Sequence, residues 1–313
     1  MLRQWAFNFN VTHSAITGLL HVLHVFHHDE LPLDSRTLLE TPRNIKTKQL
    51  NNGDFYYIGL KNILKSIVSQ TAENFENKLD ISFNIDGLPL FNSSNLQFWP
   101  ILGLVKNFKS NPFAIGIFCG RSKPQPLELF LEDFIDELLY LLQEGIEINN
   151  KRYYIAIHSF VCDAPARAFI KCIKSHTGYS CCEKCVIRGQ YIQSRVVFRD
   201  ISAPKRTNIS FINQQDEDHH IKISPLIKLG IDMITVFPID YMHACCLGVM
   251  RKLLNFWISG ALTTRLSGRK VNILSEHLES LKSYMPLEFN RKPRTLHELP
   301  RWKATELRTF LLY

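Results

Sequence analysis

The stretch that decides the fold is Ile81-Ser82-Phe83-Asn84-Ile85-Asp86-Gly87, where the sequence changes its period. Ahead of it, the apolar residues of 57–77 recur at helical spacing, which predicts a helix. Within the stretch, three apolar residues alternate with polar ones, which predicts a strand with one buried face. The pair Asp86-Gly87 is a turn sequence. A carboxylate is therefore expected at the end of a strand.

Further elements follow along the chain. We expect strands over 98–105 and 113–119, a helix over 127–143, a strand over 153–161 that runs into Cys162-Asp163, and a helix over 164–174. Strand, strand, strand, helix, strand, helix is the element order of the RNase H-like fold. In that fold the first strand and the end of the fourth lie side by side. The sequence thus predicts an α/β domain, a mixed sheet flanked by helices, with Asp86 and Asp163 close together.

The flanking regions divide the rest of the chain. An amphipathic helix is expected over 11–27, and 28–55 has the composition of a linker. Residues 176–235 carry few clear elements, and helices resume over 242–260, 270–283 and 301–312. We predict an N-terminal helical region (1–77), the first part of the RNase H-like core (78–175), a mostly helical, zinc-binding insertion (176–290) and a C-terminal helix of the core (291–313).

Composition narrows the classes of function. Of 313 residues, 45% are hydrophobic, enough for a sizeable core. The 37 basic and 29 acidic residues give a formal net charge of +8, which favours nucleic acid as a partner. No apolar run approaches the ~18 residues of a membrane span, so no membrane partner is expected. Eight cysteines without a secretory signal indicate a reducing compartment and metal binding rather than disulfides.

Asp86 and Asp163 suit metal-dependent phosphoryl transfer. That chemistry uses carboxylates that converge on two Mg²⁺ or Mn²⁺ ions ~3.5–4 Å apart. A single Asp in a turn after a strand is more often a loop or cap residue. Two of them, at strand ends that the expected fold brings together, favour a catalytic pair.

The cysteine spacing predicts one structural zinc ion. Cys182 and Cys185 form a Cys-x₂-Cys pair, which supplies half of a tetrahedral site. The main candidate for a third ligand is His243, with Asp240, Cys246 or His220 completing the site, and the pair His219-His220 is another source of ligands. Two other interpretations stay open, a pair of unrelated thiols and a redox dithiol, although no thioredoxin-like strand precedes the pair.

Two groups of charged residues complete the candidates. The acidic residues of the helix over 127–143 are expected to form a solvated face: Glu132, Asp133, Asp136 and Glu137. Several basic residues are candidate phosphate contacts: Arg121, Lys123, Arg167, Lys171 and Lys174.

Five ordered strings carry a resemblance along most of the chain. They are Ile85-Asp86-Gly87-Leu88-Pro89-Leu90 with Phe98-Trp99-Pro100-Ile101-Leu102-Gly103; Cys162-Asp163-Ala164-Pro165-Ala166-Arg167; Cys182-Glu183-Lys184-Cys185; Pro238-Ile239-Asp240-Tyr241-Met242-His243 with Leu247-Gly248-Val249-Met250; and Arg301-Trp302-Lys303-Ala304-Thr305-Glu306. With them the chain resembles the DDE/D transposase domain of the CACTA (En/Spm) group, in the form found in transposase domain-containing proteins of animal genomes.

The resemblance implies DNA cleavage and strand transfer, with Glu306 as the third catalytic carboxylate. It also implies that Cys-x₂-Cys and Asp-x₂-His, here Asp240 and His243, belong to an insertion between the second and third acidic residues. The catalytic subunit of the V(D)J recombinase is similar in this arrangement. A transposase would act in the nucleus on element ends and target DNA, as a homo-oligomer when active. Whole transposases are longer, so the chain is expected to be a fragment or a truncated copy.

Two alternatives remain beside the enzyme. One is a catalytically silent, domesticated or truncated transposase-derived protein that binds DNA or chromatin. The other is a zinc-stabilised module for protein interaction. Salt-dependent DNA binding separates the last from the other two.

Overall fold

The computed structural model describes residues 1–42, 44–70, 77–107 and 109–313, which form two compact units, Met1–Lys48 and Gln49–Tyr313. The first unit contains helices α1 (Leu2–Asn8), α2 (His13–Val25) and α3 (Ser35–Leu38). The Thr12 side chain caps α2 by accepting from the Ala15 amide. The helix predicted over 11–27 is therefore confirmed.

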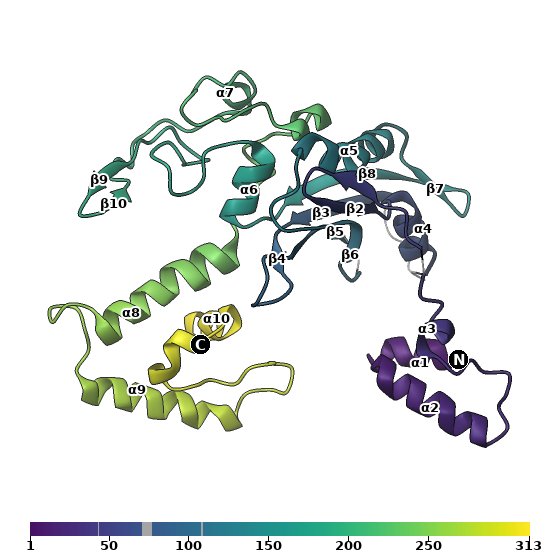
Figure 1. Ribbon diagram of the computed structural model, residues 1–313. Helices are drawn as coiled ribbons and strands as arrows, with labels where there is room; N and C mark the ends of the chain where they lie inside the picture. The colour runs from purple at the N-terminus through teal and green to yellow at the C-terminus, as the bar shows by residue number, and fades with distance from the viewer. Residues whose placement is uncertain (43, 71–76, 108) are drawn as a thin grey trace. The chain divides into compact units, whose positions relative to one another are not determined.

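The second unit is built on one mixed sheet with the strand order β1-β2-β6-β5-β3-β8-β7 (Figure 1). The strands are β1 (Lys48–Leu50), β2 (Gly53–Tyr57), β3 (Lys78–Ile85), β5 (Gln97–Val105), β6 (Phe113–Gly120), β7 (Ile146–Ile148) and β8 (Lys151–Phe160), and the short β4 (Leu88–Pro89) pairs with β5. β5 runs antiparallel to both β3 and β6, whereas β3 and β8 are parallel. The four strands predicted from periodicity are all present.

Helices flank this sheet, as predicted for an α/β protein. They are α4 (Lys61–Gln70), α5 (Leu127–Glu144) and α6 (Ala164–Lys171). The apolar stripe of α5 packs on the sheet, where the Phe134 ring lies edge-on to Phe83 at 5.1 Å between ring centroids. α4 is the helix predicted over 57–77, of which 71–76 lie outside the described residues.

Two sequence expectations for this region need correction. The predicted linker over 28–55 in fact contributes to the sheet, because β2 pairs with β6 from Gly53 to Tyr57. The acidic face of α5 is not uniformly solvated. Glu137 accepts hydrogen bonds from the Tyr57 hydroxyl and from the Leu60 and Lys61 amides, so it joins β2 and the start of α4 to α5.

Beyond α6 the chain is less regular and then helical. It contains β9 (Gln190–Ile192), β10 (Arg195–Val197), α7 (Asn208–Ile212), η1 (Pro225–Leu229), the π-helix η2 (Met242–Met250), α8 (Arg251–Ser259), α9 (Gly268–Ser280), η3 (Leu281–Ser283), η4 (Leu296–Arg301) and α10 (Ala304–Leu312). The helices after residue 241 share a small second core, which includes Met250, Leu254, Trp302 and Leu307. The predicted final helix is broken at Trp302, whose backbone is extended between η4 and α10.

Within the described ranges, none of the helices combines the length and apolar character that crossing a bilayer requires.

Candidate acidic site at the ends of β3 and β8

The parallel pairing of β3 with β8 brings the two predicted aspartates to one edge of the sheet. Phe83 is paired with Phe160, and each aspartate follows its phenylalanine by the same number of residues. Two hydrogen bonds extend the pairing, from the Val161 amide to the Phe83 carbonyl (2.8 Å) and from Asn84 Nδ2 to the Val161 carbonyl (2.6 Å). Asp86 and Asp163 therefore leave the sheet side by side.

The electrostatics of Asp86 reflect this placement. Burial raises the pKa of its carboxyl, and the negative charge of Asp163 raises it further. The Gly87 amide donates to Asp86 Oδ1 at 2.7 Å, which opposes the shift. A side chain at Gly87 would collide with the Trp99 indole, since its Cβ would come within 2.8 Å of the ring. The turn that holds Asp86 is thus closed by an indole packed on a glycine.

Asp163 begins α6. Its Oδ1 accepts from the Ala166 amide at 2.7 Å, so the carboxylate caps the helix while standing beside Asp86. Pro165 lies in the first turn of α6, where a missing amide hydrogen costs nothing. Asp163 can therefore be both a helix cap and a metal ligand, since one of its oxygens is enough for the cap.

A third segment reaches the same edge. The Phe160 amide donates to the Val236 carbonyl at 2.9 Å. Arg167 Nη1 donates to the carbonyls of both Cys162 (3.2 Å) and Pro238 (3.1 Å). These bonds hold the chain just before Asp240 against the end of β8.

Asp240 and His243 form a hydrogen-bonded pair at this place. Asp240 Oδ2 bonds His243 Nδ1, and Oδ1 accepts from the Met242 amide at 2.8 Å. The hydrogen bond with Asp240 raises the pKa of His243, and the charges of Asp163 and Asp86 add to this rise. His243 therefore lies within the electrostatic reach of the aspartates. The sequence expectation had placed this histidine at the zinc ion instead.

Glu306, the expected third carboxylate, is engaged elsewhere in this structure. It is only 5% exposed, and both of its oxygens bond Arg294, at 2.6 Å from Nε and 2.9 Å from Nη2. The Lys303 amide donates to it as well, at 2.7 Å. Burial alone would raise the pKa of this carboxyl, but Arg294 and the amide lower it overall. Its helix α10 packs against η2, the helix that carries His243.

The cysteine pair is partly arranged for a metal. Cys182 Sγ and Cys185 Sγ lie 3.3 Å apart in a loop after α6. The other two candidates for the site are placed differently: Cys246 is buried in the second core, and the His220 ring lies edge-on to Phe211 at 4.7 Å. Among the residues described, no three His, Cys, Asp or Glu side chains are close enough to share a metal ion. Neither predicted metal group is therefore assembled in this conformation.

Two of the candidate phosphate contacts are structural instead. Arg167 and Lys171 are 8% and 0% exposed, and they bond the two oxygens of Glu183 at 2.5 and 2.8 Å. Glu183 lies between the two cysteines in the sequence. The buried triad of Arg167, Lys171 and Glu183 therefore fixes residues 182–185, the cysteine loop, to α6. Lys184 adds bonds to the carbonyls of Ile234 and Phe237. The expectation that Arg167 and Lys171 face DNA was wrong because their acidic partner lies in another segment.

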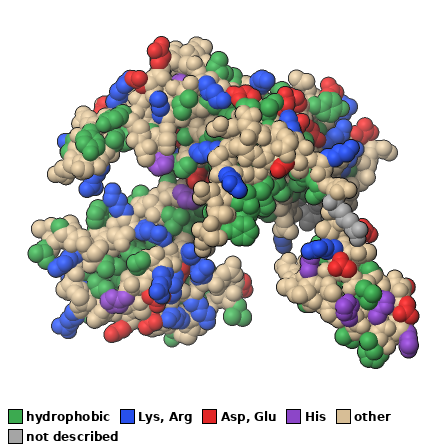
Figure 2. All heavy atoms as spheres, in the orientation of Figure 1, with side chains coloured by type: hydrophobic (Ala, Val, Ile, Leu, Met, Phe, Trp, Pro, Cys, Tyr) green, Lys and Arg blue, Asp and Glu red, His purple; other side chains and the backbone are tan. Residues whose placement is uncertain are grey.

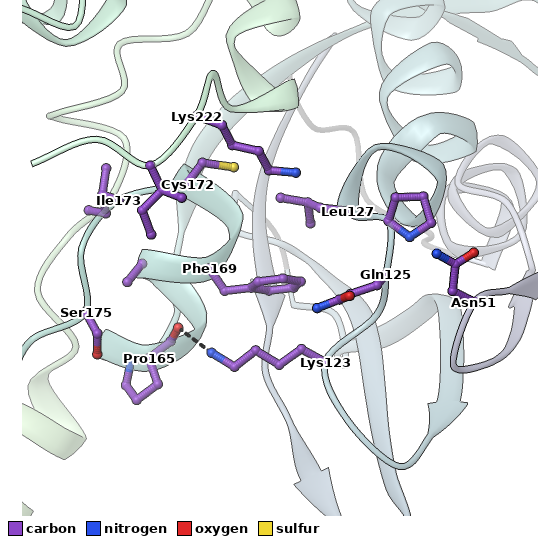
Figure 3. Close-up of a pocket in the computed structure, with 13 residues that line it drawn as sticks. Asn51, Lys123, Gln125, Leu127, Pro165, Phe169, Cys172, Ile173, Ser175 and Lys222 are labelled. Carbon is purple, nitrogen blue, oxygen red and sulfur yellow. Dashed lines mark hydrogen bonds between the residues drawn. The ribbon is translucent and has the colours of Figure 1, made fainter. Parts of the chain in front are cut away.

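Lys123 remains a candidate for binding phosphate. Its ammonium lies over the rings of Phe169 (5.2 Å) and Trp99 (5.8 Å) and donates to the Pro165 carbonyl at 3.4 Å. Burial lowers its pKa, whereas the charge of Asp163 acts in the opposite direction. Figure 3 shows Lys123 on one side of a pocket of about 450 Å³, with Phe169 in its middle and Lys222 on the opposite side. The Lys123 ammonium is thus shared by this pocket and by the edge of the sheet that bears Asp86 and Asp163, called the acidic edge below.

The comparisons with known proteins add no identification. No protein-family model matches the chain, and a search of the curated proteins finds no significant match.

Proposed function

We propose that this chain is the catalytic domain of a DNA transposase of the CACTA-like group, which cleaves and joins DNA strands with Mg²⁺ or Mn²⁺. The observation that carries the proposal is the parallel register of β3 and β8, with Asp86 and Asp163 three residues beyond the paired phenylalanines. The sheet order β6-β5-β3-β8, with only the last pair parallel, supports an RNase H-like core.

The donor set suits hard divalent cations. Carboxylate oxygens are their preferred ligands, and a cation between these two half-buried carboxyls would relieve the repulsion by which Asp163 raises the pKa of Asp86. When bound, such ions activate the attacking oxygen and stabilise the leaving one. Asp86 and Asp163 would hold them, and Glu306 would complete the set after leaving its ion pair with Arg294.

The remaining residues would bind and orient the phosphate. The Asp240 carboxylate fixes the His243 ring and favours its protonated form, which can donate to a phosphate oxygen. Lys123 supplies a second cation next to Asp163. No covalent enzyme intermediate is required, since water and then a 3′-hydroxyl serve as nucleophiles. One structural zinc, nuclear location and assembly into a homo-oligomer on DNA belong to the same proposal.

One observation favours a second candidate, a catalytically silent descendant that still binds DNA. The buried carboxylate of Glu306 is neutralised by two hydrogen bonds from the half-buried Arg294, which would keep it from the aspartates. If that pair is permanent, the chain keeps the fold without the third ligand.

Nicking of supercoiled plasmid in Mn²⁺ tests the proposal. Asp86→Asn and Asp163→Asn should each abolish nicking while DNA binding remains. Asp200→Asn is the matched control, because within the part of the chain that the structure describes this exposed carboxylate bonds only Ser202, in its own turn, and the variant should behave as wild type. Wild-type protein that binds DNA without nicking it would favour the silent descendant, and nicking that survives both substitutions would exclude the acidic edge as its source.

A further inference from the structure

His219 is a buried histidine with one nitrogen committed and the other unused. Its side chain is fully buried, its ring lies edge-on to that of His220 at 5.1 Å, and Nδ1 lies 2.7 Å from the Ser180 carbonyl. A carbonyl can only accept, so Nδ1 carries the proton and donates it. Nε2 is then the nitrogen with the free lone pair. Among the described residues, this buried Nε2 has no hydrogen-bond partner.

This is the arrangement that a metal-binding histidine adopts. Such residues commonly donate one ring N–H to a backbone carbonyl, which fixes the tautomer and presents the other nitrogen to the ion. Without an ion, a buried acceptor that lacks a partner is unfavourable, and folded proteins seldom leave one. The unpaired Nε2 of His219 therefore indicates that a ligand binds there.

The contacts around His219 tie it to the cysteine pair. Ser180, which accepts from its ring, stands directly before Cys181-Cys182 in the chain. Arg206 adds a second connection: Nε donates to the Cys182 carbonyl at 2.9 Å, and Nη2 donates to Asp216 Oδ2 at 2.6 Å. The His219 amide in turn donates to the Asp216 carbonyl at 3.0 Å.

His243 differs from His219 in its location. Its Nδ1 is bonded to Asp240, a bond that a metal-binding histidine can also make, but the charges that act on its ring are those of Asp240, Asp163 and Asp86. The segment before it is held against the end of β8 through Arg167 and Pro238. His243 thus belongs to the acidic edge.

We propose that the structural zinc ion is bound by Cys182, Cys185 and His219 through Nε2, in place of a set that includes His243. The inference rests on the zinc component of the proposed function and not on catalysis. Among the described residues no three donors share an ion's reach, so the side chains of Cys182, Cys185 and His219 must reorient when the ion binds. Two of the three donor atoms, Cys182 Sγ and Cys185 Sγ, already lie 3.3 Å apart.

Metal binding by the purified full chain tests this ligand set. After removal of metal with a chelator, Zn²⁺ and Co²⁺ are titrated into wild type, His219→Gln and His243→Gln. Wild type should take up about one ion per chain, His219→Gln should bind Co²⁺ about tenfold more weakly or worse, and His243→Gln should match wild type. Loss of metal in His243→Gln with retention in His219→Gln would overturn the proposal, and so would a wild type that binds no metal.

A second variant covers the case in which His219→Gln does not fold. His219→Cys keeps a metal donor at the site, so Co²⁺ should bind and its sulfur-to-metal charge-transfer band should strengthen as a third thiolate joins the two present. A band of wild-type intensity would show that residue 219 does not touch the ion. Because neither readout involves DNA, failure here leaves the test of Asp86 and Asp163 untouched, and failure of nicking leaves the zinc result intact.

Discussion

At the scale of single residues, the charge of Asp86 lowers the stability of the folded protein. Its pKa is raised by burial and by Asp163, so the folded state disfavours its charged form, most strongly at a pH above the raised value. We predict that Asp86→Asn raises the melting temperature of the metal-free protein by about 2 °C at pH 8 and by less at pH 5. Thermal unfolding at the two pH values measures this. Equal destabilisation at both would show that Asp86 has a structural role instead.

Gly87 is required by a close approach rather than by its backbone angles. A Cβ at this position would overlap Trp99, whose indole is buried and bonded to Gln97 at 2.8 Å. We predict that Gly87→Ala lowers the free energy of unfolding by about 1–3 kcal/mol, as overpacking does. Gly268→Ala is the control, because no atom lies within 4 Å of its added methyl group at the start of α9. Urea unfolding of both variants decides, and similar losses would argue against the overlap.

At the scale of elements, the triad of Arg167, Lys171 and Glu183 connects α6 to the cysteine loop. Removing one member of a buried ion pair leaves the other uncompensated. We predict that Arg167→Met lowers the free energy of unfolding by about 3 kcal/mol. The double variant Arg167→Met/Glu183→Gln should lose less than the sum of the losses of the two single variants. Urea unfolding of the two singles and the double measures the coupling. Strictly additive losses would contradict a shared network.

The contact between α10 and Arg294 gives a prediction that depends on pH. The pKa of Glu306 is lowered because Arg294 and the Lys303 amide outweigh burial, so its pairing stabilises the fold above the unfolded value of 4.5 and the effect fades as the pH falls through the folded value. We predict that Glu306→Gln is less stable than wild type at pH 7 by about 1–3 kcal/mol and that the difference shrinks below pH 4.

The same variant tests catalysis. Under the proposed function, Glu306→Gln also loses Mn²⁺-dependent nicking while it retains DNA binding, since the substitution keeps the shape and removes the charge. Unchanged nicking per folded molecule would leave Glu306 a purely structural residue.

Elements that follow from local patterns could be predicted, and those that depend on distant partners could not. Alternation marks β3 and helical spacing marks α5 within a few consecutive residues. The start of β2 was taken for linker because the Pro, Asp, Asn and Lys content of 28–55 indicates a loop, whereas this short strand is set by its pairing with β6. The burial of Lys171 depends on Glu183 and on the rings of Phe211 and Phe237, which no local pattern reveals.

The candidate site divides in the same way. Asp86 and Asp163 follow from element order, because each ends a recognisable strand. The position of His243 depends on two carbonyls that share one arginine, and the free nitrogen of His219 depends on the Ser180 carbonyl. The spacing of histidines along the sequence carries neither fact, although the adjacent pair His219-His220 in a cysteine-bearing segment was a usable signal.

At the scale of the whole molecule, the excess of positive charge should govern DNA binding. The net charge is +8, and on the face drawn in Figure 2 the Lys and Arg side chains are spread out rather than gathered in one patch. Exposed candidates such as Arg121 and Lys174 remain available for phosphates, whereas Arg167 and Lys171 are buried. Contacts of this kind release counterions, so affinity depends steeply on salt and little on base sequence.

We therefore predict that affinity for duplex DNA falls by about 10³–10⁵-fold between 50 and 200 mM salt if ~6–10 phosphates are contacted. Lys174→Ala should lower the salt slope by about one unit, because it removes one exposed cation. Lys171→Met should leave the salt dependence of DNA binding unchanged for the protein that folds, because the ammonium group of Lys171 is already bonded to Glu183. Fluorescence anisotropy across a salt series measures all three proteins. Salt-independent binding, or no binding, would favour a zinc-stabilised protein-interaction module, and a lower slope for Lys171→Met would mean that the buried triad opens when DNA binds.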